Sequence, residues 1–367
     1  MIYSISPILS QKLTGSASQN YFFVNQIKYI AIGLVAWVAA SAIPFWRWRQ
    51  WAPWLLLAAG LSLIGLLIPG LAVSNNGATR WVNLGVASFQ PAEALKFALI
   101  IYLAAWLEER REDLDNLSGV VPFLVIVGAI CFVIVILQRD MGTMAVVAFT
   151  SLGMYFVAGI KWRYLAGILA GGGLLGWAAI AAFPHRLSRL TTFLNPSTDV
   201  MGSGYHLNQA LIAVGSGGLL GLGLGKSLQV YGYLPEAASD SIFAIIAEEF
   251  GLIGGLAVIA LFALFGYRAM RIATHAPDAF SSYLASGIGF WFVAQAFINI
   301  AAMVSLLPLT GIPLPFISAG GTNLALSLLA AGILVNISKY TVREGSDEDR
   351  RQRGRVSRPH FANTRGR

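Results

Sequence analysis

Apolar runs long enough to cross a lipid bilayer recur along most of this chain and limit its fold more than any other feature. A spanning helix needs about 20 apolar residues, because the backbone must satisfy its own hydrogen bonds where water is absent. Only 11% of the residues are charged, against about 25% in ordinary soluble domains. The runs are continuous and lack the period-two polarity of a β-barrel. The sequence therefore predicts an all-α polytopic membrane protein.

Nine of these runs are expected to be spanning helices. They lie near residues 27–46, 51–72, 91–107, 120–137, 143–160, 163–183, 241–265, 281–304 and 320–338. Basic residues gather at alternate connections, which the positive-inside rule assigns to the cytoplasm. The outer face then carries the connections at 73–90, 138–142 and 305–319, and a large extracellular loop at about 184–240.

The two ends of the chain set the expected domain boundaries. One membrane domain covers residues 1–340, and a basic cytoplasmic tail follows at 341–367, too charged to bury apolar surface and therefore expected to be disordered. The tail's arginines favour contact with anionic membrane lipids and not with nucleic acid, since they adjoin a span and lack a recognition fold. An odd number of spans places the N-terminus outside, unless a first helix is missing before Met1.

Carboxylates are concentrated between residues 233 and 249, where the composition predicts few. An ionisable group in or beside a bilayer costs several kcal/mol unless something compensates it, so such residues are candidates for function. Asp240 is the leading candidate, and its alternative role is to cap the helix that follows. Glu248 and Glu249, deeper in that helix, are expected to serve packing and polar contacts.

Other charged residues on the outer face leave two alternatives open. Glu93 and Lys96 are neighbours at i, i+3 in the first turns of a spanning helix. They either neutralise each other, or Lys96 and Arg80 present cations to an anionic ligand while Glu93 holds Lys96 in place. Asp140 either caps the next helix or shares a polar cavity with Lys96.

Two segments rich in glycine predict close approach of backbones. Residues 213–227 superficially resemble a phosphate-binding loop, but such a loop requires a strand–helix unit that this helical pattern does not provide. A re-entrant or interfacial segment explains the glycines better. Residues 307–323 combine three prolines with three glycines. Irregular backbone at membrane depth lines a cavity or is buried in protein, so Ser318, Thr322 and Asn323 are candidate walls of a substrate groove.

Taken in order, these motifs resemble those of the shape, elongation, division and sporulation (SEDS) family. The resemblance is carried by residues 77–96, 140–143, 204–218, 234–249 and 308–321, and it extends from Met1 to about Lys339. Residues 221–236 are more similar to the division member, FtsW, than to the elongation member, RodA.

The chain departs from this family at three places. Family members have ten spanning helices with both termini cytoplasmic, and Met1–Ser6 resembles the end of the first, which implies a misassigned start. Residues 319–323 read Ala-Gly-Gly-Thr-Asn where Tyr-Gly-Gly-Ser-Ser is usual, and Arg139 stands where proline is usual. The last two departures put fine substrate contacts in doubt.

The resemblance implies a peptidoglycan glycosyltransferase that polymerises lipid II during septal wall synthesis, on the outer face of the bacterial inner membrane. Its implied partners are a class B penicillin-binding protein, which is the transpeptidase, and other divisome proteins. The alternatives are a RodA-like elongation polymerase, a lipid II flippase and a non-catalytic division scaffold. A flippase would need polar groups that continue to the cytoplasmic side, whereas the acids here gather near the outer face.

The resemblance also implies roles for individual residues. Asp240 stands at the family's catalytic aspartate position and would take the proton of the attacking sugar hydroxyl as general base. Lys96 and Arg80 would face the departing pyrophosphate. The remaining candidate substrate-binding residues are Glu93, Asp140, Ser318, Thr322 and Asn323. A divalent cation, Mg²⁺ or Mn²⁺, is implied by the family alone, and no ligand spacing identifies its site.

Overall fold

Each of the nine expected spans coincides with a helix in the computed structural model, which describes residues 21–341 except 69, 76–77, 84–87, 115, 182–190, 192 and 194–202. These helices are α2 (Tyr21–Ala42), α3 (Phe45–Ser62), α4 (Pro91–Glu109), α5 (Leu117–Val133), α6 (Met141–Val157), α7 (Trp162–Ala181), α10 (Ile242–Thr274), α11 (Ala279–Met303) and α12 (Gly321–Ser338). A 3₁₀ turn, η1 (Leu63–Leu67), extends α3, and a π-helical turn, η2 (Ile134–Gln138), extends α5. Among the described residues, six helical segments are long and apolar enough to cross a membrane. The expectation of a polytopic helical membrane protein is confirmed.

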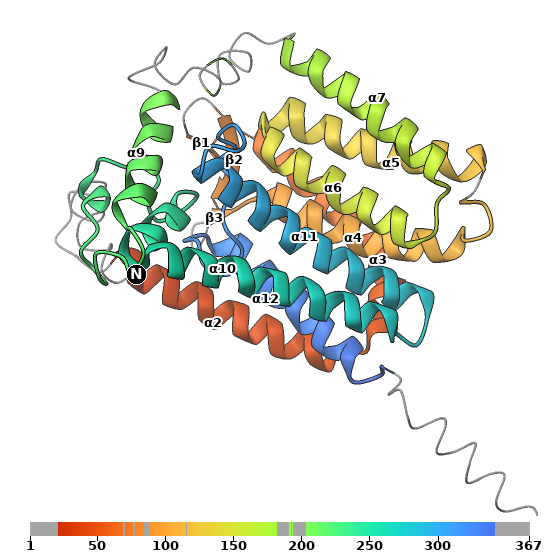
Figure 1. Cartoon of the computed structure of the whole chain (residues 1–367). Coiled ribbons are helices and arrows are strands. Elements are labelled where there is room, and N and C mark those ends of the chain that lie inside the picture. Colours follow the sequence, from red (N-terminus) through yellow and green to blue (C-terminus); the bar gives the residue numbers. More distant parts are fainter. Residues whose placement is uncertain are drawn as a thin grey trace, which may run out of the picture.

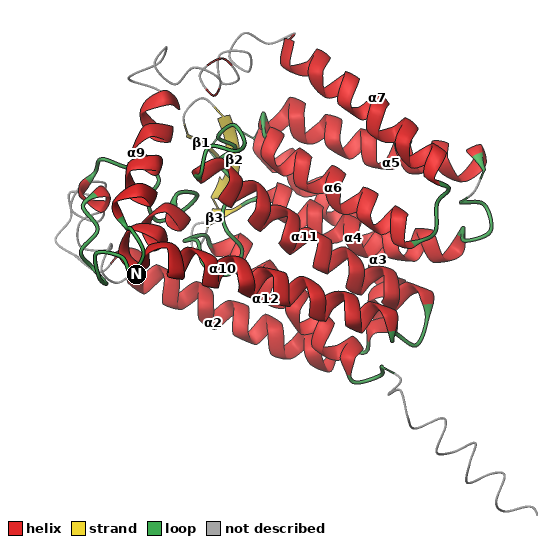
Figure 2. Ribbon diagram, viewed as in Figure 1, coloured by secondary structure: helices red, strands yellow, loops and turns green. Residues whose placement is uncertain are grey.

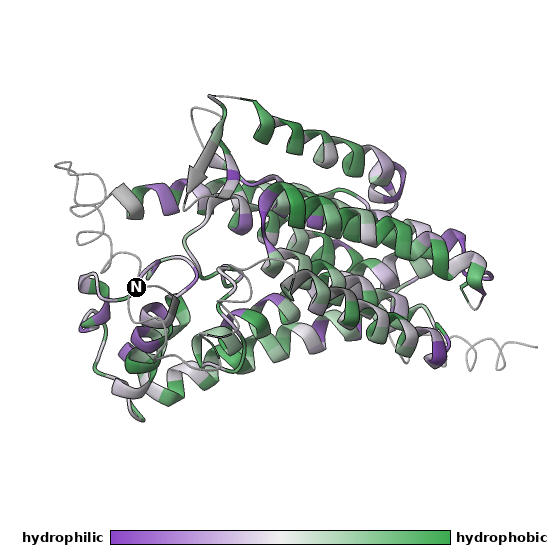
Figure 3. Ribbon diagram, turned by 90° about the horizontal axis from the view of Figure 1, so that it is seen from above, coloured by the Kyte–Doolittle hydropathy of each residue, from purple (hydrophilic) through white to green (hydrophobic). Residues whose placement is uncertain are grey.

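The helices lie side by side, with α4 and α11 at the centre of the bundle. Figure 1 shows α2 along α12 and α10 along α11, while α5, α6 and α7 form the opposite side. Hydrophobic residues make up most of the length of the helices, and hydrophilic residues gather mainly near helix ends and connections (Figure 3). This distribution fits helices that face lipid along their middle and water at their ends.

The connection before α4 is a small sheet, which was not predicted from the sequence. Figure 2 shows three short strands beside the helix ends: β1 (Ala72–Asn75), β2 (Ala78–Asn83) and β3 (Ser88–Phe89). The sheet is antiparallel in the order β1-β2-β3, with Ala72 opposite Val82 and Val82 opposite Phe89. Thr322 at the start of α12 accepts a hydrogen bond from the Gln90 N–H at 3.1 Å, which ties α12 to the end of this sheet.

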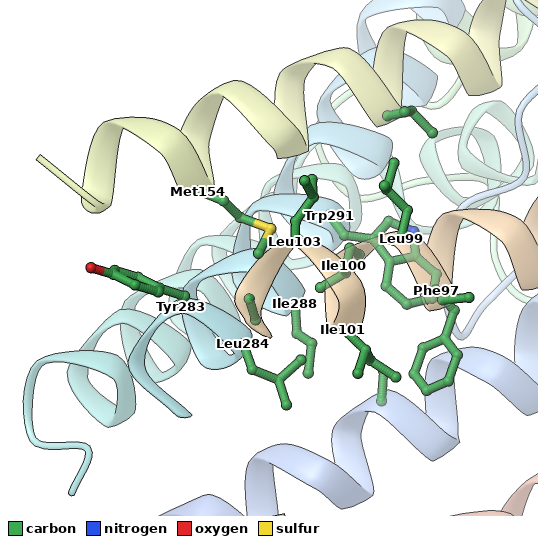
Figure 4. Close-up of a cluster of buried hydrophobic side chains, with 14 of the residues drawn as sticks. Phe97, Leu99, Ile100, Ile101, Leu103, Met154, Tyr283, Leu284, Ile288 and Trp291 are labelled. Carbon is green, nitrogen blue, oxygen red and sulfur yellow. The ribbon is translucent and has the colours of Figure 1, made fainter. Parts of the chain in front are cut away.

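The core is a tightly interlocked apolar cluster between α4, α6 and α11. Figure 4 shows Leu99 and Leu103 of α4 interleaved with Ile288 and Trp291 of α11, and all four are buried. Gly287 lets α11 approach both α6 and α4, because a Cβ there would lie 2.6 Å from the Met154 sulfur and 2.8 Å from Ile100 Cγ2. Small residues at such points let helices pack closely within a membrane, where no hydrophobic effect drives them together.

A glycine-rich segment, residues 217–226, lies against a bend in α10. It follows α9 (Ser203–Ser216), and the bend is at Gly251, whose φ of 66° and ψ of −163° are not helical. Backbone hydrogen bonds join the two: the Leu222 N–H donates to Glu248 O at 3.0 Å, and the Ile253 N–H donates to Leu219 O at 3.3 Å. The close backbone approach expected from the glycines is confirmed.

Replacing Gly217 by alanine is expected to destabilise this docked segment. A Cβ at Gly217 would lie 2.0 Å from the Ala247 carbonyl oxygen, and backbone cannot yield as a side chain can. We expect a loss of about 1–3 kcal/mol, measured as a lower Tm in detergent. Gly215→Ala is the matched control, since a Cβ there meets nothing within 4 Å and alanine favours the helix. An equal Tm for the two variants would contradict the close docking of this segment against α10.

Candidate functional site

Asp240 lies in the turn that leads into α10, and its carboxylate is only partly exposed. The N-cap residue of α10 is Ser241, which makes no capping hydrogen bond through its side chain, so the N-cap role considered for Asp240 is wrong. Burial and the nearby Glu236 carboxylate raise the pKa of Asp240 to about 7. A carboxylate of that pKa is well suited to accept a proton near neutral pH.

Ser239 links Asp240 to a second acid, Glu236, which lies on the surface. The Ser239 hydroxyl oxygen is 2.8 Å from Glu236 Oε2 and 3.5 Å from Asp240 Oδ1. Glu236 is exposed and has a left-handed backbone, with φ of 49°. On the other side of the turn, His206 of α9 is hydrogen-bonded through Nε2 to the Ser241 hydroxyl at 2.7 Å. The turn is thus held by short polar contacts on both sides of the acid.

The segment from Pro308 to Gly320, here called the proline loop, lies directly against the Asp240 turn. The Ser318 hydroxyl donates to Ser239 O at 2.5 Å, and the Ala319 N–H donates to Ala238 O at 2.8 Å. Gly311, with φ of 70°, faces the acid itself, since a Cβ there would be 3.5 Å from Asp240 Oδ2. A side chain at this position would extend from a point in contact with the carboxylate.

Two side-chain amides of α11 hold the proline loop in place by hydrogen bonds to its backbone. Asn299 Nδ2 donates to both Asp240 O and Ile312 O, each at 2.7 Å, so one side chain joins the acidic turn to the loop. Gln295 Nε2 donates to Pro313 O at 2.8 Å. Both side chains are buried, where an amide hydrogen bond is costly to break because the freed carbonyl has no water.

Lys96 and Glu93 form a buried ion pair beneath the proline loop. Lys96 Nζ lies 2.9 Å from Glu93 Oε1 and donates to Gln295 Oε1 at 2.7 Å. The ammonium also lies 4.9 Å from the centre of the Trp291 ring, and Asn323 Nδ2 donates to Glu93 Oε2 at 2.9 Å. The i, i+3 pairing expected from the sequence is confirmed. Since the Lys96 side chain is only 1% exposed, these contacts give it a supporting position behind the loop, and its contact with an anionic ligand stays a prediction.

Arg80 and Asp140 meet at the turn between η2 and α6. Asp140 Oδ1 accepts the Thr143 N–H at 2.9 Å, so its capping of α6 is confirmed. Arg80, on β2, donates to Gln138 O at 3.2 Å and Arg139 O at 3.1 Å, and its guanidinium is 3.9 Å from Asp140 Oδ2. The Arg80 side chain is 25% exposed. Of the two expected ligand-binding cations, Arg80 is therefore the one that solvent reaches.

The proline loop also connects the two charged regions. A Cβ on Gly142, at the start of α6, would lie 2.7 Å from Ile312 and 3.1 Å from Thr310. The Arg80–Asp140 contact therefore lies next to one side of residues 310–312, and Asp240 lies next to the other. Arg80 belongs to β2, Asp140 and Asp240 lie just before α6 and α10, and residues 310–312 of the proline loop lie next to both acids.

Ser318, Thr322 and Asn323, expected to line a groove, are all buried, and their hydrogen bonds run within the protein. Ser318 accepts the Leu314 N–H at 2.7 Å, and Thr322 donates to Ser88 O at 3.2 Å. Together with the Asn323–Glu93 bond, these contacts shape the ends of the proline loop. Contact of the three side chains with a substrate stays a prediction.

Sequence reasoning missed Trp291, Gln295 and Asn299. They recur every four residues in an otherwise apolar span, which places them on one helix face pointing at the site. That spacing was the available signal. Glu248, in contrast, has the polar contacts expected of it: it accepts hydrogen bonds from the Ser227 hydroxyl and from the Leu228 N–H. No group of three or more metal-binding side chains occurs within the described part of the chain.

Comparison with known proteins gives consistent matches over nearly the whole chain. Residues 1–343 match the model of the FtsW, RodA and SpoVE family, described as cell cycle protein. The chain is 39% identical to stage V sporulation protein E of Bacillus subtilis over 93% of each chain. It is 40% identical to the probable peptidoglycan glycosyltransferase FtsW of Thioalkalivibrio sp., covering 97% of this chain and 90% of the relative.

Solved structures share the fold. A chain from a study of structural coordination of polymerization and crosslinking by a peptidoglycan synthase complex aligns with a TM-score of 0.75 at 24% identity, over 92% of this chain and 96% of that one. The rod shape determining protein RodA of Thermus thermophilus aligns with a TM-score of 0.62 at 25% identity, over 93% and 95% of the two chains.

Proposed function

Because this chain belongs to the FtsW, RodA and SpoVE family of cell cycle proteins, we propose that it is a peptidoglycan glycosyltransferase that polymerises lipid II during septal wall synthesis. It is a multi-pass membrane protein, and its active site would face the outside of the inner membrane at the division septum. The observation that carries the mechanism is the Asp240 carboxylate, which is partly exposed, has a pKa of about 7 and lies beside Gly311.

Asp240 is the proposed general base. A sugar hydroxyl of the acceptor attacks the anomeric carbon of the donor, a new glycosidic C–O bond forms, and the bond from that carbon to the pyrophosphate oxygen breaks. The hydroxyl proton passes to Asp240, and undecaprenyl pyrophosphate leaves with the bonding electrons. General base catalysis of this kind contributes about 10²–10⁴-fold to the rate.

Arg80 is the proposed cation for the departing pyrophosphate. Its side chain is partly exposed, whereas Lys96 is almost completely buried. A guanidinium held by two backbone carbonyls is preorganised to face phosphate oxygens. Lys96 would then act through Gln295, which it holds in place for the hydrogen bond to Pro313 O.

A divalent cation, Mg²⁺ or Mn²⁺, fits the acidic turn as a proposal. Mg²⁺ commonly uses one or two carboxylates together with substrate phosphates, and Asp240 and Glu236 both approach the Ser239 hydroxyl. Glu236, which is exposed, would hold the ion, and the ion would supply positive charge to the pyrophosphate while Asp240 stays free to accept the proton. The partners proposed with this activity are a class B penicillin-binding protein, which would crosslink the glycan strand, and other divisome proteins.

The apolar core beneath the site disfavours a flippase. Below Lys96, the cluster around Leu99, Leu103 and Ile288 is buried and apolar, and a lipid-linked sugar crossing the membrane there would need polar partners.

Polymerisation of fluorescent lipid II by the purified protein with its penicillin-binding partner, with the glycan products resolved on gels, tests the function. Transbilayer movement of lipid II without glycan strands would instead support the flippase.

Polymerisation is expected to depend on pH through Asp240. The base must be ionised, so the rate should rise as pH passes about 7 and level off above it. At two pH units below the midpoint the rate should be about one hundredth of the plateau. Glu236→Gln removes the neighbouring negative charge that raises this pKa, so its rate profile should move to lower pH. A profile flat between pH 5 and 8 in both proteins would exclude Asp240 as the base.

Replacing Asn299 by leucine is expected to lower kcat more than it raises KM. The change removes the amide that joins Asp240 O to Ile312 O, so the base and the loop lose their fixed separation. Misplacement of about 1 Å can cost about 10²-fold in rate. Asn336→Leu is the matched control, because that amide bonds Ser41 O at the opposite end of the bundle. Equal losses of kcat in the two variants would show a general packing effect.

A further inference from the structure

The glycine-rich segment, residues 217–226, exposes an unusual amount of apolar surface for a loop. Leu219 is 69% exposed, Leu220 78%, Leu222 39% and Leu224 61%. Lys226, also exposed, is the only charged residue between Ile212 and Pro235. Leucines placed in water at this density would be costly, since each buried leucine side chain gains about 1.5–3 kcal/mol.

The segment does not need water for its backbone, because α10 supplies partners. The Gly223 N–H donates to Glu249 O at 3.0 Å, and the Leu252 N–H donates to Gly218 O at 2.9 Å. Gly221 lies so close that a Cβ there would be 2.1 Å from Glu249 O. Non-helical backbone is tolerated at membrane depth only when the protein satisfies it in this way.

The depth of the segment follows from the length of α10. The helix has 33 residues, or roughly 50 Å at 1.5 Å per residue, whereas the hydrocarbon core is about 30 Å thick. If Arg268 marks the cytoplasmic boundary, the core extends back about 20 residues, to about Glu248. The bend at Gly251, where the segment docks, then lies just inside the outer boundary.

The exposed leucines of the segment continue the lipid-facing side of α10. Leu252 and Ile253 of that helix are each more than half exposed, and their N–H groups donate to Gly218 O and Leu219 O. The first two turns of α10, in contrast, are buried on all sides. One apolar surface therefore runs from the spanning helix onto the segment without interruption.

We infer that residues 217–225 are embedded in the outer leaflet of the membrane, with their leucines against lipid acyl chains and the Lys226 ammonium at the level of the phosphates. This site binds a lipid surface and is independent of the polymerisation chemistry. It also accounts for the resemblance of residues 213–227 to a phosphate loop, because glycines let the backbone approach its partner closely in both: a phosphate there and α10 here.

Depth-dependent fluorescence quenching tests this placement. In a Cys131→Ser background, which removes the only cysteine, Leu220→Cys would carry an environment-sensitive dye, and Glu236→Cys would be the control in the acidic turn. The full chain is reconstituted in vesicles of phosphatidylcholine and phosphatidylglycerol. For an interfacial segment buried about 5–10 Å, the Leu220 dye should be quenched at least about twofold more than the control by lipid spin-labelled high on the acyl chain.

Aqueous iodide should give the opposite order, with the control quenched more strongly. Leu224→Cys provides a second position on the same surface, so that failure of one variant to fold does not decide the outcome. Quenching of both segment positions by iodide at the level of the control would place the segment in water and overturn the inference. Protection of both positions from lipid and iodide alike would mean that protein covers the surface, which also overturns it.

Discussion

Asp240→Asn is expected to abolish lipid II polymerisation while leaving the protein folded. The amide keeps the size and most contacts of the carboxylate but cannot accept the proton of the attacking hydroxyl. The expected loss is about 10²–10⁴-fold. Folding should be preserved, because the hydrogen bonds that hold the turn are made by Ser239, Ser241 and Asn299. The measurement is glycan strand synthesis by the purified variant with its partner, beside a melting curve.

Asp278→Asn is the matched control for that experiment. Asp278 caps α11 at the end remote from the site, where its Oδ1 accepts the Ser281 N–H at 2.8 Å. Asparagine caps a helix about as well as aspartate, so this change should cost less than the ~1 kcal/mol of losing the cap and should leave polymerisation near the wild-type rate. Substantial glycan synthesis by Asp240→Asn would remove Asp240 from the mechanism. An equal loss in Asp278→Asn would show that the assay reports on stability.

Lys96→Met is expected to reduce both stability and polymerisation by a large amount. It leaves the Glu93 carboxylate buried without its cation, which typically costs about 3–5 kcal/mol. It also removes the hydrogen bond that orients Gln295 toward the proline loop. Glu93→Gln should cost less, since an amide can still contact Asn323 and Lys96. The measurements are Tm and the polymerisation rate of each variant.

The double variant Glu93→Gln/Lys96→Met separates the two roles considered for Lys96. If Lys96 acts as a support, removing both charges should recover much of the stability and part of the activity lost in Lys96→Met. If the ammonium instead contacts pyrophosphate, stability should recover while activity stays low. A larger loss of Tm and polymerisation rate in Glu93→Gln than in Lys96→Met would contradict the prediction that Lys96 is the more important residue of the pair.

The positions of the spans could be predicted from the sequence because membrane insertion constrains each helix separately. Hydropathy alone located α10 and α12, and the Asp140 cap depended only on residues within one turn. The cost of charge near a bilayer also singled out Asp240. Each of these inferences uses local physics, which a single sequence contains.

Contacts between distant segments could not be predicted in the same way. Gln295 and Asn299 carry no charge, and their partners are backbone carbonyls of a loop whose path depends on the whole bundle.

The β1–β2 pairing could have been predicted more easily from the sequence. Asn76-Gly77 stands between Asn75 and Ala78, which are paired across the two strands, and Asn-Gly is a common hairpin signal. In this sequence the signal is short and stands between long apolar runs, which dominate the pattern.

The proline loop has a consequence for how the enzyme would be regulated. Thr310 and Ile312 contact Gly142 beside the guanidinium of Arg80, while Gly311 faces Asp240. Three consecutive residues thus separate the group proposed to hold the donor from the group proposed to activate the acceptor. A protein partner that displaced this loop slightly would change both at once. Donor binding and acceptor activation would then be adjusted together, and neither half of the reaction could be tuned without the other.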